Sequence, residues 1–102
     1  AELPALDVLY MTRIQQERFF NEEDYLLLKG CYSLNAKLLE LAPPDMPVLH
    51  PLPRIDEIKL DVDNDPRAAY FDQVHNGVYI RMAIILALLG IPDPLTGKTV
   101  LN

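Results

Sequence analysis

Short apolar runs in the first half of the chain alternate with more polar segments of helical character. Three runs have the length and composition of buried strands: Leu6–Tyr10, Cys31–Leu34 and Met46–His50. A helical pattern lies between each run and the next. The order strand, helix, strand, helix, strand predicts a parallel sheet with right-handed crossovers.

Two helices are predicted between these strands from their capping residues. Asn21 reads as an N-cap, and the acidic residues that follow it lie where the helix dipole favours negative charge. This helix is predicted to run to Lys29 and to stop at Gly30. Asn35 can cap a second, short helix that ends at Ala42, because two consecutive prolines follow.

The second half of the chain is predicted to hold a loop and two further helices. Ile58–Asn64 is expected to be extended or looped, and Asp65-Pro66 then starts a helix that runs to about His75. Asn76-Gly77 separates it from the last helix, Val78–Leu89, which is apolar on every side from Met82 onward and must be buried all round. The predicted helices cannot surround this segment and also cover both faces of a sheet. We therefore expect the chain to be part of a larger α/β unit.

The composition is that of one small globular domain with an acidic balance. The formal net charge is −6, and no stripe of Lys or Arg is present to neutralise phosphates, which disfavours nucleic-acid binding. The longest unbroken apolar run, Met82–Leu89, is far shorter than a membrane span, and the first residues show no signal-peptide pattern. Cys31 is the one cysteine, which excludes an intrachain disulfide and favours a reducing, cytoplasmic setting.

A proline-rich turn, His50–Arg54, follows the third predicted strand. Because proline fixes φ and lacks a backbone donor, neither a central strand nor a helix can continue through it. A stiff turn at the carboxyl end of a buried strand is where open α/β sheets place ligands. The Leu52-Pro53 bond can also adopt the cis form, which could aim the carbonyl group of Leu52 outward in a fixed direction.

A polar cluster follows the first predicted strand, again at a carboxyl end. Arg13 and Gln15 project from it, and arginine is suited to grip a carboxylate through two parallel hydrogen bonds. The cluster has two interpretations, a clamp for an anionic substrate or a salt bridge at a surface or between domains, and spacing alone favours the second. Glu17 and Arg18 could pair with each other or hold Arg13 in place, and support of Arg13 is the favoured role.

Other titratable residues give weaker signals. His50 could act as a general base or, as we favour, make a structural hydrogen bond. Its spacing to Cys31 and His75 argues against a metal site. Three alternating aspartates resemble the start of a calcium loop but lack its central glycine and closing glutamate, so a solvated acidic loop is expected: Asp61, Asp63 and Asp65.

Four segments together resemble aspartate carbamoyltransferase, the catalytic polypeptide of pyrimidine synthesis: Tyr10–Phe19 (YMTRIQQERF), His50–Ile58 (HPLPRIDEI), Asp63–Phe71 (DNDPRAAYF) and Asn76–Ala83 (NGVYIRMA). The resemblance covers the chain from residue 5 to residue 90 without a large gap. The related ornithine carbamoyltransferases are similar in fold but have a cysteine within the proline turn and a different ligand loop. HPLP at 50–53 and TRIQ at 12–15 therefore favour aspartate as the second substrate.

The resemblance implies a reaction in de novo pyrimidine biosynthesis. The amino group of L-aspartate attacks the carbonyl carbon of carbamoyl phosphate, giving N-carbamoyl-L-aspartate and phosphate. No metal or organic cofactor is implied, and rate comes from positioning and charge stabilisation. Arg13 and Gln15 would bind L-aspartate. Leu52 and Pro53 would be the catalytic residues that contact carbamoyl phosphate, with the Leu52 carbonyl holding its amide or the attacking amine.

The same resemblance implies the remaining roles and the domain organisation. Glu17 would orient Arg13, and Arg18 would bridge to the other domain on closure. The fold would be part of a Rossmann-like parallel sheet flanked by helices, incomplete on its own. Residues 1–76 would be the carboxyl-terminal part of the aspartate-binding domain, 77–90 a terminal helix that packs back on the carbamoyl-phosphate domain, and 91–102 a tail.

The expected partners follow from this incompleteness. The chain would act beside an upstream half that binds phosphate, in a cytoplasmic homotrimer of catalytic chains with or without regulatory chains. Residues 1–102 alone should be inactive. Two alternatives stay open, a non-catalytic α/β interaction domain and a carbamoyltransferase for another amino acid. The intact Arg13, Gln15 and Leu52-Pro53 count against the first.

Overall fold

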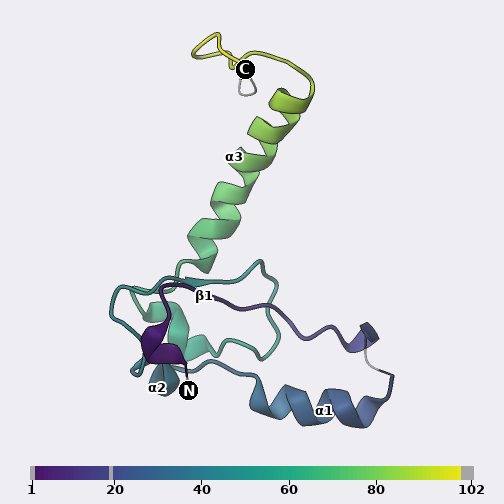
Figure 1. Cartoon of the computed structure of the whole chain (residues 1–102), viewed down its shortest axis with the longest axis vertical. Helices are drawn as coiled ribbons and strands as arrows, with labels where there is room; N and C mark the ends of the chain where they lie inside the picture. The colour runs from purple at the N-terminus through teal and green to yellow at the C-terminus, as the bar shows by residue number, and fades with distance from the viewer. Residues whose placement is uncertain (1, 19, 100–102) are drawn as a thin grey trace. The chain divides into compact units, whose positions relative to one another are not determined.

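The chain forms two compact units, Ala1–Phe71 and Asp72–Asn102 (Figure 1). The structure, a computed structural model, describes residues 2–18 and 20–99. Phe19, in the first of the recognised segments, and the last three residues of the predicted tail lie outside this description. Within it, the strands and the shorter helices belong to the first unit, and most of α3 (Tyr70–Leu88) belongs to the second.

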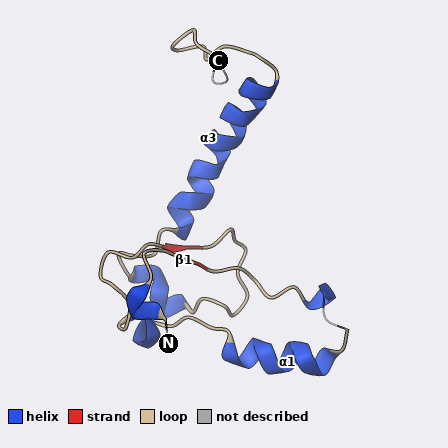
Figure 2. Ribbon diagram, in the orientation of Figure 1, coloured by secondary structure: helices blue, strands red, loops and turns tan. Residues whose placement is uncertain are grey.

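A parallel pair of strands lies at the centre of the first unit, as the order of predicted elements indicates. β1 (Leu9–Tyr10) pairs with β2 (Val48–Leu49), and Leu9 is opposite Val48 (Figure 2). The pairing continues for one more hydrogen bond, from the Met11 amide to the Leu49 carbonyl at 2.8 Å. The strands are shorter than the apolar runs that predicted them, and most of the residues that do not join the ladder lie at the amino ends of these runs.

β2 is flanked by polypeptide on both sides. Opposite β1, the Val48 amide donates to the Arg67 carbonyl at 2.8 Å, and the Ala69 amide donates to the Val48 carbonyl at 3.0 Å, forming a parallel bridge with Ala68. β2 is therefore the interior strand, which accounts for the complete burial of Val48.

The predicted strand Cys31–Leu34 is not formed, and this prediction is wrong. Cys31 is the last residue of a helix, and Leu34 makes a single parallel bridge with Ile58. The Leu34 amide donates to the Glu57 carbonyl, and the Lys59 amide donates to the Leu34 carbonyl, both at 2.8 Å. Sheet-like bonding therefore reaches this segment at one residue.

The first two helices begin at the predicted caps but end elsewhere. The side chain of Asn21 accepts a 2.8 Å hydrogen bond from the Asp24 amide and starts α1 (Glu22–Cys31), which continues through Gly30. The side chain of Asn35 likewise starts α2 (Ala36–Leu39).

α2 ends at Leu39, earlier than the predicted Ala42. The guanidinium of Arg67 donates to three carbonyls at the end of this helix, those of Leu39, Ala42 and Pro43, at 2.9, 3.3 and 3.2 Å. A side chain from far along the sequence therefore satisfies the acceptors that a longer helix would have bonded itself.

Three short 3₁₀ turns lie in the first unit: η1 (Leu3–Ala5), η2 (Gln16–Arg18) and η3 (Leu60–Asn64). η3 occupies most of the segment predicted to be extended or looped. Asp65, predicted to start a helix, instead follows η3, and its carboxylate accepts hydrogen bonds from the backbone amide and the guanidinium of Arg67 at 2.9 and 2.8 Å.

One long helix, α3, replaces the two predicted after Asp65. It runs without a break through Asn76-Gly77, since residues of low helix propensity cost only about 1 kcal/mol each inside a 19-residue helix. Its end is the predicted one: Gly90 has φ +65°, its amide donates to the Ala87 carbonyl, and the Ile91 amide donates to the Leu86 carbonyl at 2.9 Å. This is a Schellman cap.

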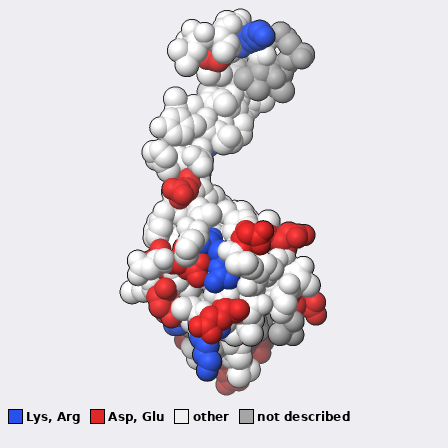
Figure 3. All heavy atoms as spheres, turned by 90° about the vertical axis from the view of Figure 1, so that its left-hand side faces the viewer, with Lys and Arg blue, Asp and Glu red and all other residues white. Residues whose placement is uncertain are grey.

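The surface of α3 is largely apolar. It carries two charged residues, Asp72 and Arg81, whereas charged side chains cover much of the first unit (Figure 3). Most of its large apolar side chains are more than half exposed, among them Val78, Tyr79, Ile80, Met82, Ile84, Ile85 and Leu88. Such a surface is typical of a helix that is covered in its native setting. No helix in the described ranges has the length and hydropathy of a membrane span.

The apolar core lies in the first unit around β2. No described residue of α1 is among its buried members, which come from segments on both sides of that helix: Met11, Leu34, Leu39, Ala42, Met46, Val48, Ile58, Val62 and Tyr70. This core fixes the carboxyl ends of β1 and β2, where the two polar stretches of the sequence begin.

We predict that the recombinant 102-residue chain self-associates, because the apolar side chains of α3 have no cover of their own. Sedimentation and binding of a hydrophobic dye measure this. Ile84→Glu combined with Leu88→Lys should reduce both signals, whereas the exposed Lys37→Glu should not. A monomeric chain that unfolds cooperatively and binds no dye would contradict the expectation.

Candidate functional site

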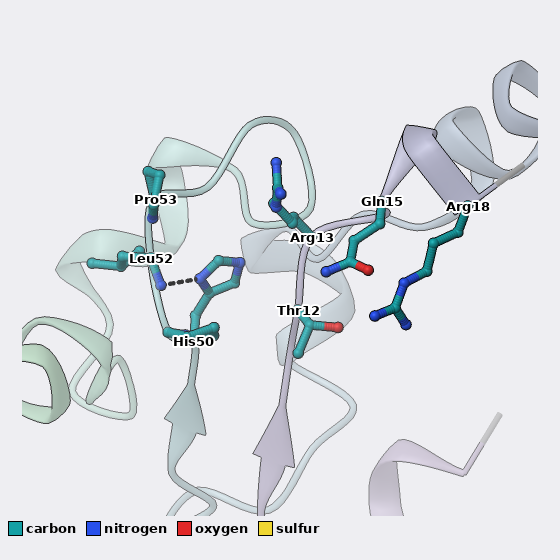
Figure 4. Close-up of a pocket in the computed structure, with 8 residues that line it drawn as sticks. Thr12, Arg13, Gln15, Arg18, His50, Leu52 and Pro53 are labelled. Atoms are coloured by element: carbon teal, nitrogen blue, oxygen red, sulfur yellow. Dashed lines mark hydrogen bonds between the residues drawn. The ribbon is translucent and has the colours of Figure 1, made fainter. Parts of the chain in front are cut away.

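A cavity of about 570 Å³ opens at the carboxyl ends of β1 and β2. It brings together the two stretches singled out in the sequence, and its lining contains these residues: Thr12, Arg13, Gln15, Arg18, His50, Pro51, Leu52 and Pro53. Figure 4 shows the residues after β1 on one side, the proline turn on the other, and the ring of His50 between them. The parallel pairing causes this arrangement, since parallel strands end at the same edge of a sheet.

The proline turn has the backbone geometry that was suggested from its sequence. The Leu52-Pro53 peptide bond is cis, and Leu52 has φ +50°, in the left-handed region. Pro51 and Pro53 have no amide hydrogen, so Leu52 supplies the one backbone donor at these three positions. That donor bonds Nδ1 of His50 at 2.8 Å (Figure 4).

His50 is a buried, hydrogen-bonded residue rather than a free base. It is 1% exposed, and its Nε2 lies 2.9 Å from Oε1 of Glu57, which is 5% exposed. The other oxygen of Glu57 accepts from the amides of Ile55 and Asp56 at 3.2 and 3.1 Å. Burial raises the pKa of Glu57, but these hydrogen bonds outweigh it, so the pKa is lowered and the carboxylate is charged.

Glu57 was not identified from the sequence. The one signal for it was an acidic residue beside an apolar one at the end of the proline segment, and this does not distinguish a buried carboxylate from a solvated one. The burial comes from the Leu34–Ile58 bridge, which draws the residue into the core.

The segment after β1 supplies the cationic side of the cavity. Nη2 of Arg13 lies 3.3 Å from Oε1 of Glu17, the contact suggested from the sequence. Their side chains are 48% and 60% exposed, so the pair restrains the guanidinium while contributing little to stability. Gln15 and Arg18 line the same cavity.

The described lining contains two arginines and no acidic side chain. Such a site is suited to an anion, above all a carboxylate that a guanidinium can grip with two hydrogen bonds. Among residues 2–18 and 20–99, no group of three or more His, Cys, Asp or Glu side chains is placed to hold a metal ion.

A second polar cluster anchors the far end of the proline turn. Nη2 of Arg54 donates to Oδ2 of Asp63 at 2.5 Å, and its Nη1 donates to the other carboxylate oxygen and to the Tyr70 hydroxyl, the latter at 3.3 Å. The guanidinium also lies 5.6 Å from the ring centroid of Tyr70. The turn is thereby joined to η3 and to the first residue of α3.

The expectation of a solvated acidic loop holds for the exposed Asp61 and is wrong for the other two aspartates. Asp63 and Asp65 are paired with Arg54 and Arg67, and the four side chains are between 13% and 24% exposed. Hydrogen bonds from Arg54 hold the pKa of Asp63 below its usual value, against the effect of burial. Burial, together with the hydrogen bond to Asp63, raises the pKa of Tyr70 to about 12.

Known proteins share both the sequence and the fold of this chain. Residues 1–88 match the profile of the family described as aspartate/ornithine carbamoyltransferase, Asp/Orn binding domain. The aspartate carbamoyltransferase catalytic subunit of Bifidobacterium longum (strain DJO10A) is 60% identical over 97 residues, which make up 95% of this chain and 30% of that protein. The chain thus spans about 30% of the length of the curated relatives it matches.

Two solved structures of aspartate transcarbamoylase from Trypanosoma cruzi are similar. The complex with N-(phosphonacetyl)-L-aspartic acid has a TM-score of 0.73 and 45% identity, over 81% of this chain and 26% of that one. The complex with carbamoyl phosphate and aspartate has a TM-score of 0.70 and 42% identity, over 81% and 25%.

A hybrid protein allows the Arg54 cluster to be tested in a complete setting. In this hybrid, the chain replaces the matching 97 residues of the Bifidobacterium longum relative. Arg54→Met should lower the free energy of unfolding at pH 7 by about 3 kcal/mol, because it leaves the partly buried carboxylate of Asp63 without its cationic partner. Urea titration measures this.

The effect should depend on pH with a definite sign. Asp63 has a lowered pKa in the folded protein, so its contribution is complete above its ordinary value near 4 and is lost as the pH falls through the lowered value. The difference in stability between the variant and its parent should therefore shrink as the pH is lowered below about 4. Lys59→Met, which removes an exposed 3.8 Å pair with Asp56, should cost no more than about 1 kcal/mol. Equal losses for the two variants would contradict the assignment.

Proposed function

Since this chain belongs to the aspartate/ornithine carbamoyltransferase family, we propose that it is the L-aspartate-binding part of an aspartate carbamoyltransferase. The complete enzyme would transfer the carbamoyl group of carbamoyl phosphate to the amino group of L-aspartate, in de novo pyrimidine biosynthesis. The nitrogen lone pair forms a bond to the carbonyl carbon, and the carbon–oxygen bond to phosphate then breaks from a tetrahedral intermediate. The amine gives up its proton, and N-carbamoyl-L-aspartate and phosphate are released.

The cavity between the two strand ends carries this proposal. On one side, Arg13 and Gln15 would bind the carboxylates of L-aspartate, with Glu17 holding the guanidinium in place. On the other, the backbone of Leu52 and Pro53 would contact carbamoyl phosphate, with the Leu52 carbonyl accepting a hydrogen bond from its amide or from the attacking amine. Rate would come from holding nucleophile and carbonyl carbon together and from stabilising developing charge.

The charge of the cavity supports aspartate over ornithine. Aspartate has a side-chain carboxylate that a guanidinium attracts, whereas ornithine has a side-chain ammonium that a guanidinium repels. Two arginines and no acidic residue line the described cavity, so an anionic amino acid is favoured.

The site would be completed by residues from the rest of the enzyme. The chain spans about 30% of its curated relatives, and we infer that the exposed apolar surface of α3 packs on the remaining part. Arg18, at the rim of the cavity, would bridge to that part when the site closes. A cytoplasmic homotrimer, with or without regulatory chains, belongs to the same proposal.

The hybrid should form N-carbamoyl-L-aspartate from L-aspartate and carbamoyl phosphate, while the 102-residue chain alone should not. Product formation by the purified proteins measures this, with the unmodified relative as the positive control. A hybrid that assembles to the size of the relative but forms no product would contradict the proposal and favour a non-catalytic interaction domain. Preference for another amino acid in competition would contradict the assignment of aspartate.

Arg13→Ala in the hybrid should raise the KM for L-aspartate about a hundredfold, as expected for loss of a charge-assisted contact. The KM for carbamoyl phosphate should stay nearly unchanged. Glu17→Gln, which leaves Arg13 in place but removes its partner's charge, should raise the aspartate KM only about threefold. Steady-state kinetics with each substrate varied in turn measures both. Unchanged aspartate kinetics in Arg13→Ala would refute the role of Arg13.

A further inference from the structure

The proline turn depends on a buried histidine to which the proposed reaction assigns no role. His50 lies at the end of β2, two residues before Leu52, and only 1% of its surface is exposed. It donates or accepts on both sides of its ring: Nδ1 faces the Leu52 amide at 2.8 Å, and Nε2 faces the Glu57 carboxylate at 2.9 Å.

These contacts determine the protonation of the ring. A backbone amide can only donate, so Nδ1 must be the acceptor and carry no proton. The ring proton is then on Nε2, where it is donated to the charged carboxylate of Glu57. A hydrogen on Nδ1 would point at the amide hydrogen of Leu52 and break that bond. His50 therefore has no ring nitrogen available to take a proton from a substrate.

The Leu52 amide is the one hydrogen-bond donor with which the turn can be held at these positions. Pro51 and Pro53 have no amide hydrogen, and Leu52 has φ +50°, in a region that residues with a β-carbon rarely adopt. The hydrogen bond to Nδ1 spans from residue 50 to residue 52, as in a turn closed by the side chain of Asn or Asp. Nδ1 of His50 thus accepts the hydrogen bond from the amide two residues on, as the side-chain oxygen of Asn or Asp does in other turns.

We propose that His50, fixed in its Nε2–H form by Glu57, is the positioning residue that holds the backbone of Leu52 at the cavity. This inference rests on the proposed function, in which the Leu52 carbonyl contacts the carbamoyl group. Glu57 acts through His50. Because its other oxygen, Oε2, accepts hydrogen bonds from the Ile55 and Asp56 amides, Glu57 has a fixed position from which to orient the ring.

Two amide substitutions separate the two sides of the ring. In His50→Asn, the side-chain oxygen can still accept from the Leu52 amide but cannot reach Glu57. In His50→Gln, the longer side chain can still donate to Glu57 but loses the short turn to Leu52. We expect His50→Asn to keep the kcat of the hybrid within about threefold and His50→Gln to lower it roughly 10- to 100-fold, with the aspartate KM little changed.

Hydrogen exchange gives a readout that does not depend on activity. Since Pro51 and Pro53 have no amide hydrogen, exchange in the segment from 51 to 53 reports the Leu52 amide alone. It should be slow in the parent hybrid and in His50→Asn and fast in His50→Gln. The same two substitutions at His75, which is exposed on α3, should not differ from each other in either measurement.

A double substitution tests whether Glu57 acts through His50. Glu57→Gln keeps an oxygen for the Ile55 and Asp56 amides but presents an N–H donor to Nε2 of His50, which favours the wrong tautomer. It should lower kcat as His50→Gln does, but it should have little further effect when combined with His50→Asn, whose hydrogen bond to Leu52 does not need Glu57. Equal losses in the two His50 variants, a larger loss in His50→Asn, or additive losses when Glu57→Gln is combined with His50→Asn would overturn the proposal. If the parent hybrid is active and any of these results is found, only the role of His50 is refuted. If the parent hybrid assembles correctly but is inactive, the proposed function itself is refuted.

Discussion

The parallel pairing of β1 and β2 is the constraint on which the rest of this molecule depends. It consists of two residues in each strand, yet it fixes the direction in which both chains leave the core. Because the strands are parallel and in register, the segment with Arg13 and the segment with Leu52 emerge at the same edge. An antiparallel pair would have sent them to opposite ends, and no cavity could have joined them.

Two buried polar clusters hold the proline turn at its opposite ends. His50 and Glu57 bind the start of the turn from within the core, and Arg54 binds Asp63 and Tyr70 at its end. Prolines cannot secure a turn through backbone donors, so side chains must supply the hydrogen bonds that a regular loop would make itself. The turn is consequently held by contacts with Glu57, Asp63 and Tyr70, which lie outside its own five residues.

The two units differ in how their apolar surface is satisfied. The first unit buries its apolar residues around β2 and exposes charge, whereas α3 exposes apolar side chains along most of its length. The cavity has cationic residues on one side and an anchored turn on the other. The chain that forms it spans about 30% of the length of its relatives. Both features support the proposal that the chain functions within a larger protein.

The sequence by itself determined the features that arise from local chemistry. Asn21 and Asn35 cap helices and Gly90 ends one, because capping needs only a side chain or a flexible backbone at one position. The order of apolar runs predicted the parallel pair, and the polar stretches after two of them predicted both sides of the cavity.

Only the tertiary structure decided what depends on distant partners. Arg67 bonds the carbonyls at the end of α2, which is shorter than predicted. α3 continues through Asn76-Gly77, where a break was expected. Asp63 and Asp65 form ion pairs and are only partly exposed. The burial of Glu57 also could not be predicted from the sequence. The environment of a carboxylate depends on the residues that the fold brings to it and not on its neighbours in the sequence.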